Sequence, residues 1–484
     1  MWIGLTLLLP VVAILITALP VRAAVAGTAA ALLAALNVAV AATIAVQLAG
    51  HSPVTLVPGW LAIDSFGGIV LLLETFGALT ALLFSVGYLK SPHISDRRLK
   101  RYLLWLHLFL LALYAIPLLN ELALVWLALT LTTLFSVFLV SFERTPAALE
   151  AGWKYALLTT LGAALALLGI LLLYWALTKA GGSDFTWHGL TRAAGEMPGS
   201  IVSLAFLLML VGFGTKAALI PFHAWLPDAY SQAPFPVCAM LSILESVAIP
   251  YVILRLVGTI GAAHGSHAPQ WLLVFGLVSA GGAALLILQT REYKRLFAYS
   301  TIENTGIILT AGAMASNHLK QAALWQMIAH GFTKPVIFLA AGIMFVLVGK
   351  LRISEVRGVL SASWVVGSVV MLAGLALAGA PPFAIFLSEL AILKSGMVGS
   401  QAWVVMLLAA FMIVSFCAIT YHLFRMVLGK APEDSARDRS VIAIACWWAL
   451  VVALVPVVVL GWWMPPFLHH LITGGAAALG GTSP

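Results

Sequence analysis

Charged residues are scarce in this chain, because only 9% of its 484 residues are Asp, Glu, Lys or Arg while 62% are hydrophobic. A soluble globular domain carries about 25% charged residues, so this composition excludes one. Long hydrophilic stretches are also lacking. The longest, at about 178–200 and 429–440, are far shorter than the roughly 50 residues that a domain usually needs. These absences indicate a polytopic membrane protein without a separate soluble domain.

Cysteine is equally rare. Cys238, Cys417 and Cys446 fall in three separate apolar spans and show no C-x-x-C spacing, which argues against a disulfide framework and against an iron–sulfur or zinc site. The glycine-rich motifs that hold nucleotide phosphates are absent too. We therefore expect no metal, no cofactor and no redox chemistry in this chain itself.

Long apolar runs predict the fold class. Runs of about 18 residues or more predict transmembrane helices, and we count fourteen of them. Their approximate limits are 2–20, 24–48, 63–89, 102–119, 122–142, 151–177, 201–221, 235–258, 269–290, 296–316, 319–348, 362–393, 402–428 and 441–463. The sequence thus predicts an all-α polytopic membrane protein.

The basic residues predict an orientation. Connections that follow odd-numbered spans hold eighteen of the 25 lysines and arginines. These are Arg22, Lys90, Arg97, Arg98, Lys100, Arg101, Arg144, Lys154, Arg291, Lys294, Arg295, Lys350, Arg352, Arg357, Arg425, Lys430, Arg437 and Arg439. The positive-inside rule then places these connections in the cytoplasm and both termini outside. The net charge of +8 therefore reflects topology in a bacterial or archaeal cytoplasmic membrane, and we expect no nucleic-acid partner.

Two apolar spans contain an ionisable residue beside a helix-breaking sequence. In the first, Lys216 follows a run of apolar and small residues and precedes a segment rich in proline. In the second, Pro381 and Pro382 interrupt the span, which then carries Glu389. Intramembrane charges are functional-site hypotheses, and paired interrupted helices indicate the transport site of an inverted-repeat transporter.

Further ionisable residues lie inside other spans. Lys334 follows His330 by four residues, so both occupy one helix face. Glu245 lies in the interior of its span and needs a partner or a proton there. Glu74 is another intramembrane acid, which we interpret as paired locally or placed at a subunit interface.

Four segments resemble the proton-translocating antiporter-like subunits of respiratory complex I, of multisubunit Na+/H+ antiporters and of membrane-bound hydrogenases. They are WKYALLTTLGAALALLGILLLY (153–174), GFGTKAALIPFHAWLPDAYSQAP (212–234), REYKRLFAYSTIENTG (291–306) and LALAGAPPFAIFLSE (375–389). The elements AYSTIEN and PPFAIFLSE are most similar to hydrogenase 4 component F. The resemblance implies fourteen helices, in which helices 4–8 and 9–13 form two inverted repeats and helices 7 and 12 are broken. We accordingly divide the chain into N-terminal helices (1–101), a first repeat (102–258), a second repeat (259–428) and a last helix with its tail (429–484).

The resemblance also implies roles for single residues. Lys216 would be the central lysine of helix 7, Lys334 its counterpart on helix 11, His330 a relay and Glu389 the acid that exchanges a proton with the outside. A buried lysine of this kind gains or loses its proton when a nearby carboxylate moves. The secondary candidates are Glu74, His223, Asp228, Glu303 and Lys394.

The sequence departs from the family pattern on three helices. Thr130 stands where family members usually carry a helix 5 glutamate, and Gln326 replaces the first of two helix 11 histidines. On helix 8, where complex I subunits often carry a lysine, this chain has Glu245. We expect Glu245 either to replace the missing acid or to be a protonated, hydrogen-bonded glutamate.

Three functions remain open at this point. The chain could move protons in a hydrogenase 4-like or complex I-like assembly, with other membrane subunits and a soluble redox or hydrogenase module as partners. It could be the membrane subunit of a two-component CO2 or bicarbonate uptake system, with a carbonic-anhydrase-like zinc protein. It could also be a scaffold that has lost translocation. In each case the lipid bilayer surrounds it.

The orientation can be tested by labelling cysteines placed in a chain whose native cysteines are replaced by serine. A cysteine at Ser95 should react only with reagent on the cytoplasmic side, and one at Ser183 only with reagent outside, because the basic connections are retained in the cytoplasm. Labelling in the reverse pattern would contradict the orientation.

Overall fold

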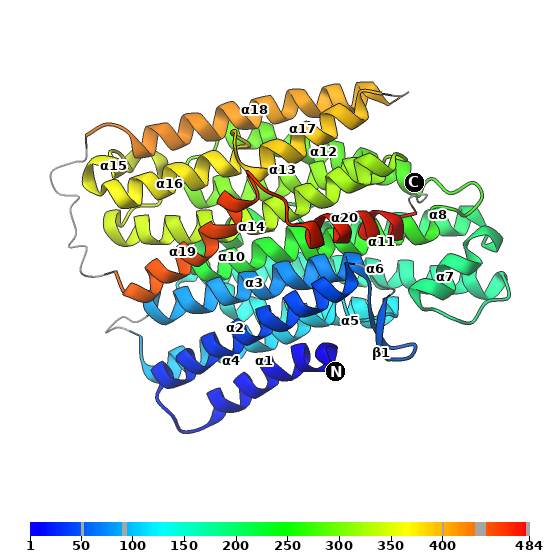
Figure 1. Ribbon diagram of the computed structural model, residues 1–484, viewed down its shortest axis with the longest axis horizontal. Coiled ribbons are helices and arrows are strands. Elements are labelled where there is room, and N and C mark those ends of the chain that lie inside the picture. Colours follow the sequence, from blue (N-terminus) through cyan, green and yellow to red (C-terminus); the bar gives the residue numbers. More distant parts are fainter. Residues whose placement is uncertain (50–52, 90–93, 399–400, 431–441, 481–484) are drawn as a thin grey trace.

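The computed structural model describes residues 1–49, 53–89, 94–398, 401–430 and 442–480. Its helices lie side by side in one bundle (Figure 1), with α1 (Trp2–Ala18) at one edge and α18 (Ala402–Val427) at the opposite edge. Both termini lie at the end of the bundle that carries α7 (Trp187–Ala193) and the β1–β2 hairpin. Of the basic residues predicted in cytoplasmic connections, Lys90, Arg437 and Arg439 lie outside the described residues.

The remaining elements have the following bounds. Before the first break they are α2 (Ala23–Leu48), β1 (Val54–Val57), β2 (Leu61–Ile63), α3 (Ser65–Tyr88), α4 (Asp96–Ala115), α5 (Leu122–Val140), α6 (Pro146–Lys179), η1 (Ala194–Glu196) and α8 (Gly199–Lys216). Between the breaks they are α9 (Trp225–Gln232), α10 (Phe235–Ile243), the π-helical turn η2 (Leu244–Ala248), α11 (Ile249–Ile260), α12 (Ala268–Leu288), α13 (Tyr293–Ala313), α14 (Asn317–Val348), η3 (Ile353–Glu355), α15 (Val359–Ala362) and α16 (Trp364–Leu377). After the second break they are α17 (Ala384–Gly396), α19 (Ile444–Val459) and α20 (Pro466–Ala478).

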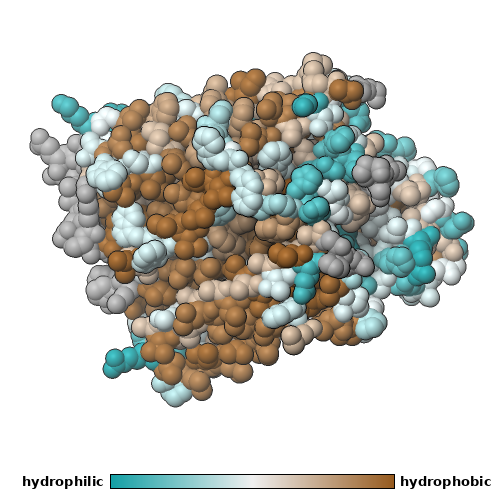
Figure 2. Space-filling model, viewed as in Figure 1, coloured by the Kyte–Doolittle hydropathy of each residue, from teal (hydrophilic) through white to brown (hydrophobic). Residues whose placement is uncertain are grey.

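The all-α membrane fold is confirmed. Each predicted span coincides with one or more helices, and nine helices within the described residues are long and apolar enough to cross a membrane. Figure 2 shows a broad hydrophobic face over the helices, with hydrophilic side chains gathered at the end that carries α7. The count of fourteen crossings stays a prediction.

Local sequence begins several helices where expected. Asp64 accepts a hydrogen bond from the Gly67 amide (2.9 Å) at the start of α3, and Thr145 accepts one from Ala148 (3.1 Å) at the start of α6. Such side chains satisfy amides that have no partner within the helix. The elements outside the predicted spans include the β1–β2 hairpin, α7, α9 and the C-terminal helix α20, which packs on α3 and α14.

The interior of the bundle is built around one buried helix. Elements α10, η2 and α11 form one continuous helix, and its most apolar stretch of 18 residues is entirely buried. It packs against α3, α13 and α14. Every polar group on this helix must therefore find its partner within the protein or in bound water.

Glycines allow two helix pairs to approach closely. A Cβ at Gly212 on α8 would lie 2.4 Å from the Gly162 carbonyl oxygen on α6, and a Cβ at Gly306 on α13 would lie 2.6 Å from the Gly276 carbonyl oxygen on α12. Small residues of this kind let membrane helices pack backbone to backbone. The first contact holds α8, and hence Lys216, in position.

The two interruptions predicted in helices 7 and 12 are confirmed. Helix α8 ends at Lys216 and α9 begins at Trp225, while α16 ends at Leu377 and α17 begins at Ala384. Both breaks contain a left-handed residue, Ala218 (φ 54°) and Gly379 (φ 80°), and a proline three residues later. The similarity supports the assignment of the two segments to related repeats.

The α6–α8 contact can be tested with Gly212→Ala. We expect the new methyl group to separate the two helices and to cost about 1–3 kcal/mol, as overpacking does, which thermal unfolding in detergent would measure. Gly195→Ala is the control, because a Cβ there would have no neighbour within 4 Å. Equal unfolding temperatures for the two variants would contradict the close contact.

Candidate functional site

The first break ends at a buried lysine. Lys216 is the last residue of α8 and is only 4% exposed. The backbone freed at the break has partners, because the Trp225 indole donates to the Thr215 carbonyl (2.8 Å) and the Leu219 amide donates to Gly214 (2.7 Å). Lys216 therefore sits at the C-terminal end of a half-helix, where the helix dipole favours a positive charge.

The amine of Lys216 contacts a hydroxyl and not a carboxylate. Its Nζ donates to Thr133 Oγ1 on α5. Thr130, at the position of the missing glutamate, donates instead to the Trp126 carbonyl of its own helix (2.9 Å). Within the described residues, no carboxylate lies within ion-pair distance of Lys216. Thr133, which sequence reasoning missed, is thus its direct partner.

Glu245 lies in the π-helical turn η2 and is completely buried. Its Oε2 accepts a hydrogen bond from the Tyr230 hydroxyl (2.7 Å), and its Oε1 has no partner among the described residues. Tyr230 belongs to α9, directly after the first break. Glu245 is close enough to both Lys216 and Lys334 to interact with each electrostatically. Because π-turns often occur at functional sites, Glu245 is the candidate acid of this part of the site.

The second lysine is held by α13. Lys334 is 0% exposed, and its Nζ donates to the Phe297 carbonyl and to Ser300 Oγ, both at 2.6 Å. His330 lies one turn earlier on α14, and no described residue is a hydrogen-bond partner of either ring nitrogen. Pro335, which follows Lys334 in the helix, has no N–H. The Gly331 carbonyl therefore lacks its usual helical partner.

A side-chain network joins α14 to the second broken helix. Gln326 donates to Asn304 on α13 (2.7 Å) and accepts from Ser388 on α17 (2.5 Å). The residue that replaces a family histidine therefore bridges three helices. Glu303 lies beside this network on α13 and accepts a hydrogen bond from Ser415 on α18. Sequence reasoning missed Asn304, Ser388 and Ser415, because isolated polar residues in apolar spans do not reveal which helices they join.

Glu389 folds back toward the second break. Its Oε2 lies 2.7 Å from the place that a Cβ at Gly379 would occupy, so the left-handed glycine leaves room for the carboxylate. The same carboxylate faces a cavity of about 290 Å³ between α17 and α18, which is lined by Leu390, Met412 and Phe416 among others. Glu389 is thus the candidate residue nearest to the outer surface of the bundle at this break.

The secondary candidates are dispersed. Asp228 forms ion pairs with Arg295 (2.7 Å) and Lys154 (3.4 Å), and Lys394 is exposed in the last turn of α17. His223 is only half-buried in the segment between α8 and α9, and its Nδ1 has no partner. Glu74 is buried on α3, and neither of its oxygens has a partner.

A lysine that sequence reasoning assigned to a cytoplasmic connection is buried. Lys294 lies in the first turn of α13 and donates to the carbonyls of Ser231 (3.1 Å) and Ala233 (2.5 Å). It therefore ties the segment after α9 to α13, close to Tyr230. A basic residue at a span boundary gives no sequence signal that separates such a structural role from a solvated one.

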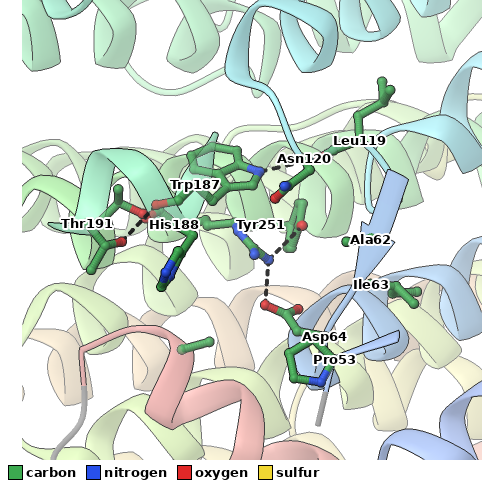
Figure 3. A pocket seen from close by; sticks show the side chains of 13 residues that line it. Pro53, Ala62, Ile63, Asp64, Leu119, Asn120, Trp187, His188, Thr191 and Tyr251 are labelled. Carbon is green, nitrogen blue, oxygen red and sulfur yellow. Dashed lines mark hydrogen bonds and ion pairs between the residues drawn. The ribbon is translucent and has the colours of Figure 1, made fainter. Parts of the chain in front are cut away.

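A polar cavity of about 360 Å³ opens at the end of the bundle that carries α7 (Figure 3). Its floor contains an ion pair between Asp64 and Arg255 (2.8 Å), and the guanidinium lies near the rings of Trp187 and Tyr251 (5.2 and 5.5 Å). Arg255 also donates to the Tyr251 hydroxyl (2.9 Å). The cavity gives solvent access to this end of α3 and α11. Among the described residues, no three His, Cys, Asp or Glu side chains form a group that could hold a metal.

Residues 119–416 match the transmembrane family described as NADH:quinone oxidoreductase/Mrp antiporter. The matched region contains both breaks and the residues from Thr133 to Glu389. The chain belongs to this family. A hydrogenase-4 component F homolog of Methylacidiphilum infernorum is 34% identical over 79% of this chain and 82% of that protein. Subunit N of the NADH-quinone oxidoreductase of Desulforudis audaxviator is 28% identical over 78% of this chain and 75% of that subunit.

Solved structures share the fold of this chain. A chain of the Mrp complex from a Dietzia species superposes with a TM-score of 0.86 at 20% identity, covering 99% of this chain and 97% of that one. A chain of the archaeal membrane-bound sulfane sulfur reductase gives 0.86 at 21% identity, with 99% and 98% covered. A chain of complex I from Thermus thermophilus gives 0.81 at 20% identity, with 99% and 100% covered. These solved relatives all belong to multisubunit membrane complexes.

The position of Glu389 can be tested with dicyclohexylcarbodiimide, an apolar reagent for protonated carboxyl groups. We expect it to modify Glu389, which faces a membrane-side cavity, and to spare Glu245, which is completely buried. Mass spectrometry of peptides would locate the label. Gly379→Ala should reduce the modification of Glu389 several-fold, because the new methyl group would displace the carboxylate.

Gly265→Ala is the matched control for this experiment. Gly265 is also left-handed (φ 74°), but a Cβ there would have no neighbour within 4 Å. The control variant therefore has the strain of a left-handed alanine, roughly 1–2 kcal/mol, but its new methyl group collides with no carboxylate. Equal loss of labelling in both variants would show that Glu389 does not lie against the break.

Proposed function

We propose that this chain is a proton-translocating membrane subunit of a hydrogenase 4-like or complex I-like assembly. The proton would pass along Lys216, Glu245, Lys334 and Glu389, with His330 as a relay beside Lys334. The chain itself would carry out no redox chemistry, and conformational changes in its partners would drive the transfer.

One observation carries the proposal. Within the part of the chain that the structure describes, the two deeply buried lysines Lys216 and Lys334 make hydrogen bonds only to neutral groups: a threonine hydroxyl in the first case, and a serine hydroxyl and a carbonyl in the second. A buried lysine with a fixed counter-ion would remain charged, whereas one without it can be switched by the approach or withdrawal of a carboxylate. Neither lysine is therefore locked in a structural ion pair.

Glu245 is the carboxylate best placed to act as that switch. It interacts with both lysines, and only one of its oxygens is held by Tyr230. A small rotation of its side chain within the π-turn would favour one lysine over the other. This supports the first of the two interpretations of Glu245, in which it replaces the absent helix 5 acid.

The outward step would use the second break. The Asn304–Gln326–Ser388 network connects α13 and α14 to α17, and Glu389 follows Ser388 directly. Amide side chains do not exchange protons themselves, so this network would hold the three helices together while water beside it carries the proton. Glu389 would then exchange its proton outside.

The comparisons support the choice of assembly. The relative from Methylacidiphilum infernorum is named a hydrogenase-4 component F homolog, which favours that branch over inorganic-carbon uptake. We propose other membrane subunits and, through them, a soluble hydrogenase or redox module as partners. We further propose a cytoplasmic membrane with both termini outside, and inverted repeats at residues 102–258 and 259–428.

One structural feature favours the scaffold alternative. The direct partner of Lys216 is the neutral Thr133, so the family's usual acid–lysine pair is absent. A chain that only spaces its neighbours would not need this lysine to change its protonation. The experiment below separates the two functions.

Lys216→Ala should reduce proton movement by at least about tenfold, as the loss of a positioned proton-transfer group does. The measurement is acidification of vesicles that contain the assembled complex. Lys179→Ala is the control, because that lysine is exposed in the last turn of α6 and is not a candidate for the path. Assembly should survive in both variants, since Lys216 makes one side-chain hydrogen bond to α5.

Thr133→Val extends the test at nearly constant volume. It removes the hydroxyl that holds the amine, so we expect a partial loss of transport and no loss of assembly. Full transport in Lys216→Ala would refute translocation through this site and leave the scaffold function.

A further inference from the structure

A cavity at the opposite end of the bundle from the two termini has no part in the proposed proton path. Its volume is about 450 Å³, and its lining includes residues 352–354, which precede α15 in the chain. Figure 1 shows α15 at the end of the bundle far from the N and C labels. Three segments form its walls: residues 290–292 between α12 and α13, residues 352–354 around η3, and the end of α18 with His422 and Arg425.

The walls are held together by the backbone. The Ile353 amide donates to the Arg291 carbonyl (2.9 Å), and the Tyr293 amide donates to Leu351 (3.3 Å). The turn η3 also packs against α18. The cavity is therefore preformed, because the segments that carry its arginines are connected independently of any ligand.

The cavity has an excess of positive charge. It is lined by Arg291, Arg352 and Arg425, and in the part of the chain that the structure describes neither Arg291 nor Arg425 forms an ion pair. Arg352 lies 3.9 Å from Glu355, at the limit of an ion pair. The lining carboxylate, Glu292, already accepts from Ser231 (2.8 Å) and lies 3.5 Å from Arg295. This arrangement attracts an anion.

A buried polar atom points to a second contact with the ligand. His422 is 6% exposed and lines the cavity, and its Nδ1 has no partner in the described ranges of the chain. The ring is hydrogen-bonded to the backbone of Ile287 and Leu288. A neutral imidazole that donates through one nitrogen accepts through the other, so Nδ1 is available for a hydroxyl group.

An apolar surface continues from the cavity along α12 and α18. Leu288 (50% exposed) lies two residues before the first wall, and Tyr421 (62%) and Phe424 (43%) directly precede His422 and Arg425 of the last one. These side chains face away from the protein where lipid chains surround a membrane helix. The ligand that matches both surfaces has an anionic head and a hydrocarbon tail.

We propose that this cavity binds the headgroup of an anionic phospholipid of the phosphatidylglycerol type. The phosphodiester lies between Arg291 and Arg425, a headgroup hydroxyl donates to His422 Nδ1, and an acyl chain follows Leu288 and Phe424. Basic cavities between transmembrane helices recognise anionic headgroups in this way. The site is independent of the proton path, so either can fail without the other.

The test measures lipid binding to the full-length chain in an uncharged detergent by native mass spectrometry. Phosphatidylglycerol should bind at least about tenfold more tightly than phosphatidylcholine with the same acyl chains. The variant Arg291→Gln/Arg425→Gln should remove this preference. Arg357→Gln is the matched control, because that exposed arginine follows η3 without lining the cavity. All three proteins should unfold at the same temperature without lipid, since the substituted side chains are exposed.

Two further probes define the ligand. Phosphatidylmethanol has the same phosphodiester without a hydroxyl and should bind about threefold to tenfold more weakly, by the loss of one hydrogen bond. Inorganic phosphate should compete only weakly, because it has no acyl chain. Equal binding of phosphatidylcholine, or an equal effect of Arg357→Gln, would overturn the site. Equal binding of phosphatidylmethanol would overturn the hydroxyl contact, and strong competition by phosphate would show a site for soluble anions instead.

Discussion

Two helices of this protein are interrupted inside an apolar bundle, and the rest of the site depends on how the freed polar groups are satisfied there. Hydrocarbon offers no hydrogen bonds, so non-helical backbone at this depth must be covered by protein or water. At the first break the Trp225 indole covers a freed carbonyl of α8. At the second, Gly379 leaves space into which Glu389 folds. The same requirement places Lys216 and Glu389 beside the breaks, where a charge has helix ends and polar groups near it.

The glycine contacts and the buried central helix follow from this constraint. Helix α8 can end in the interior because Gly212 lets it lie directly against α6. The helix from Phe235 to Ile260 is enclosed by α3, α13 and α14, so Glu245 depends on Tyr230 for a partner. The helices pack tightly against backbone but leave polar side chains with few partners. Among the described residues, one oxygen of Glu245, both oxygens of Glu74 and both ring nitrogens of His330 have no hydrogen-bond partner. Such groups require water or protons, which are the substances that a translocating subunit must admit.

The sequence predicted the helices and breaks because their signals are local. Apolar length reports a membrane helix, and Pro381 and Pro382 report an interruption whatever surrounds them. Partners between helices were harder to predict. The family motif identified Thr130 as the altered position on α5. The orientation of α5 about its axis, however, places Thr133 against Lys216. Likewise, Gln326 was recognised as a departure from the family, while its bridge between Asn304 and Ser388 depends on three helices at one depth. The hairpin, α7 and α20 lack the long apolar runs by which the other elements were found.

The replacement of an acid by a threonine beside Lys216 changes what the remaining carboxylates must do. A fixed glutamate on α5 would stabilise the charged amine in every conformation, whereas the Thr133 hydroxyl accepts from a charged amine and can donate to a neutral one. The charge of Lys216 would then depend on Glu245, the carboxylate near both lysines. Only one oxygen of Glu245 accepts a hydrogen bond, which comes from Tyr230. In this arrangement one acid serves two lysines. In the proposed path, stabilising a proton on one of them would withdraw the stabilisation from the other, and this alternation would couple the two halves of the path without a permanent ion pair in either.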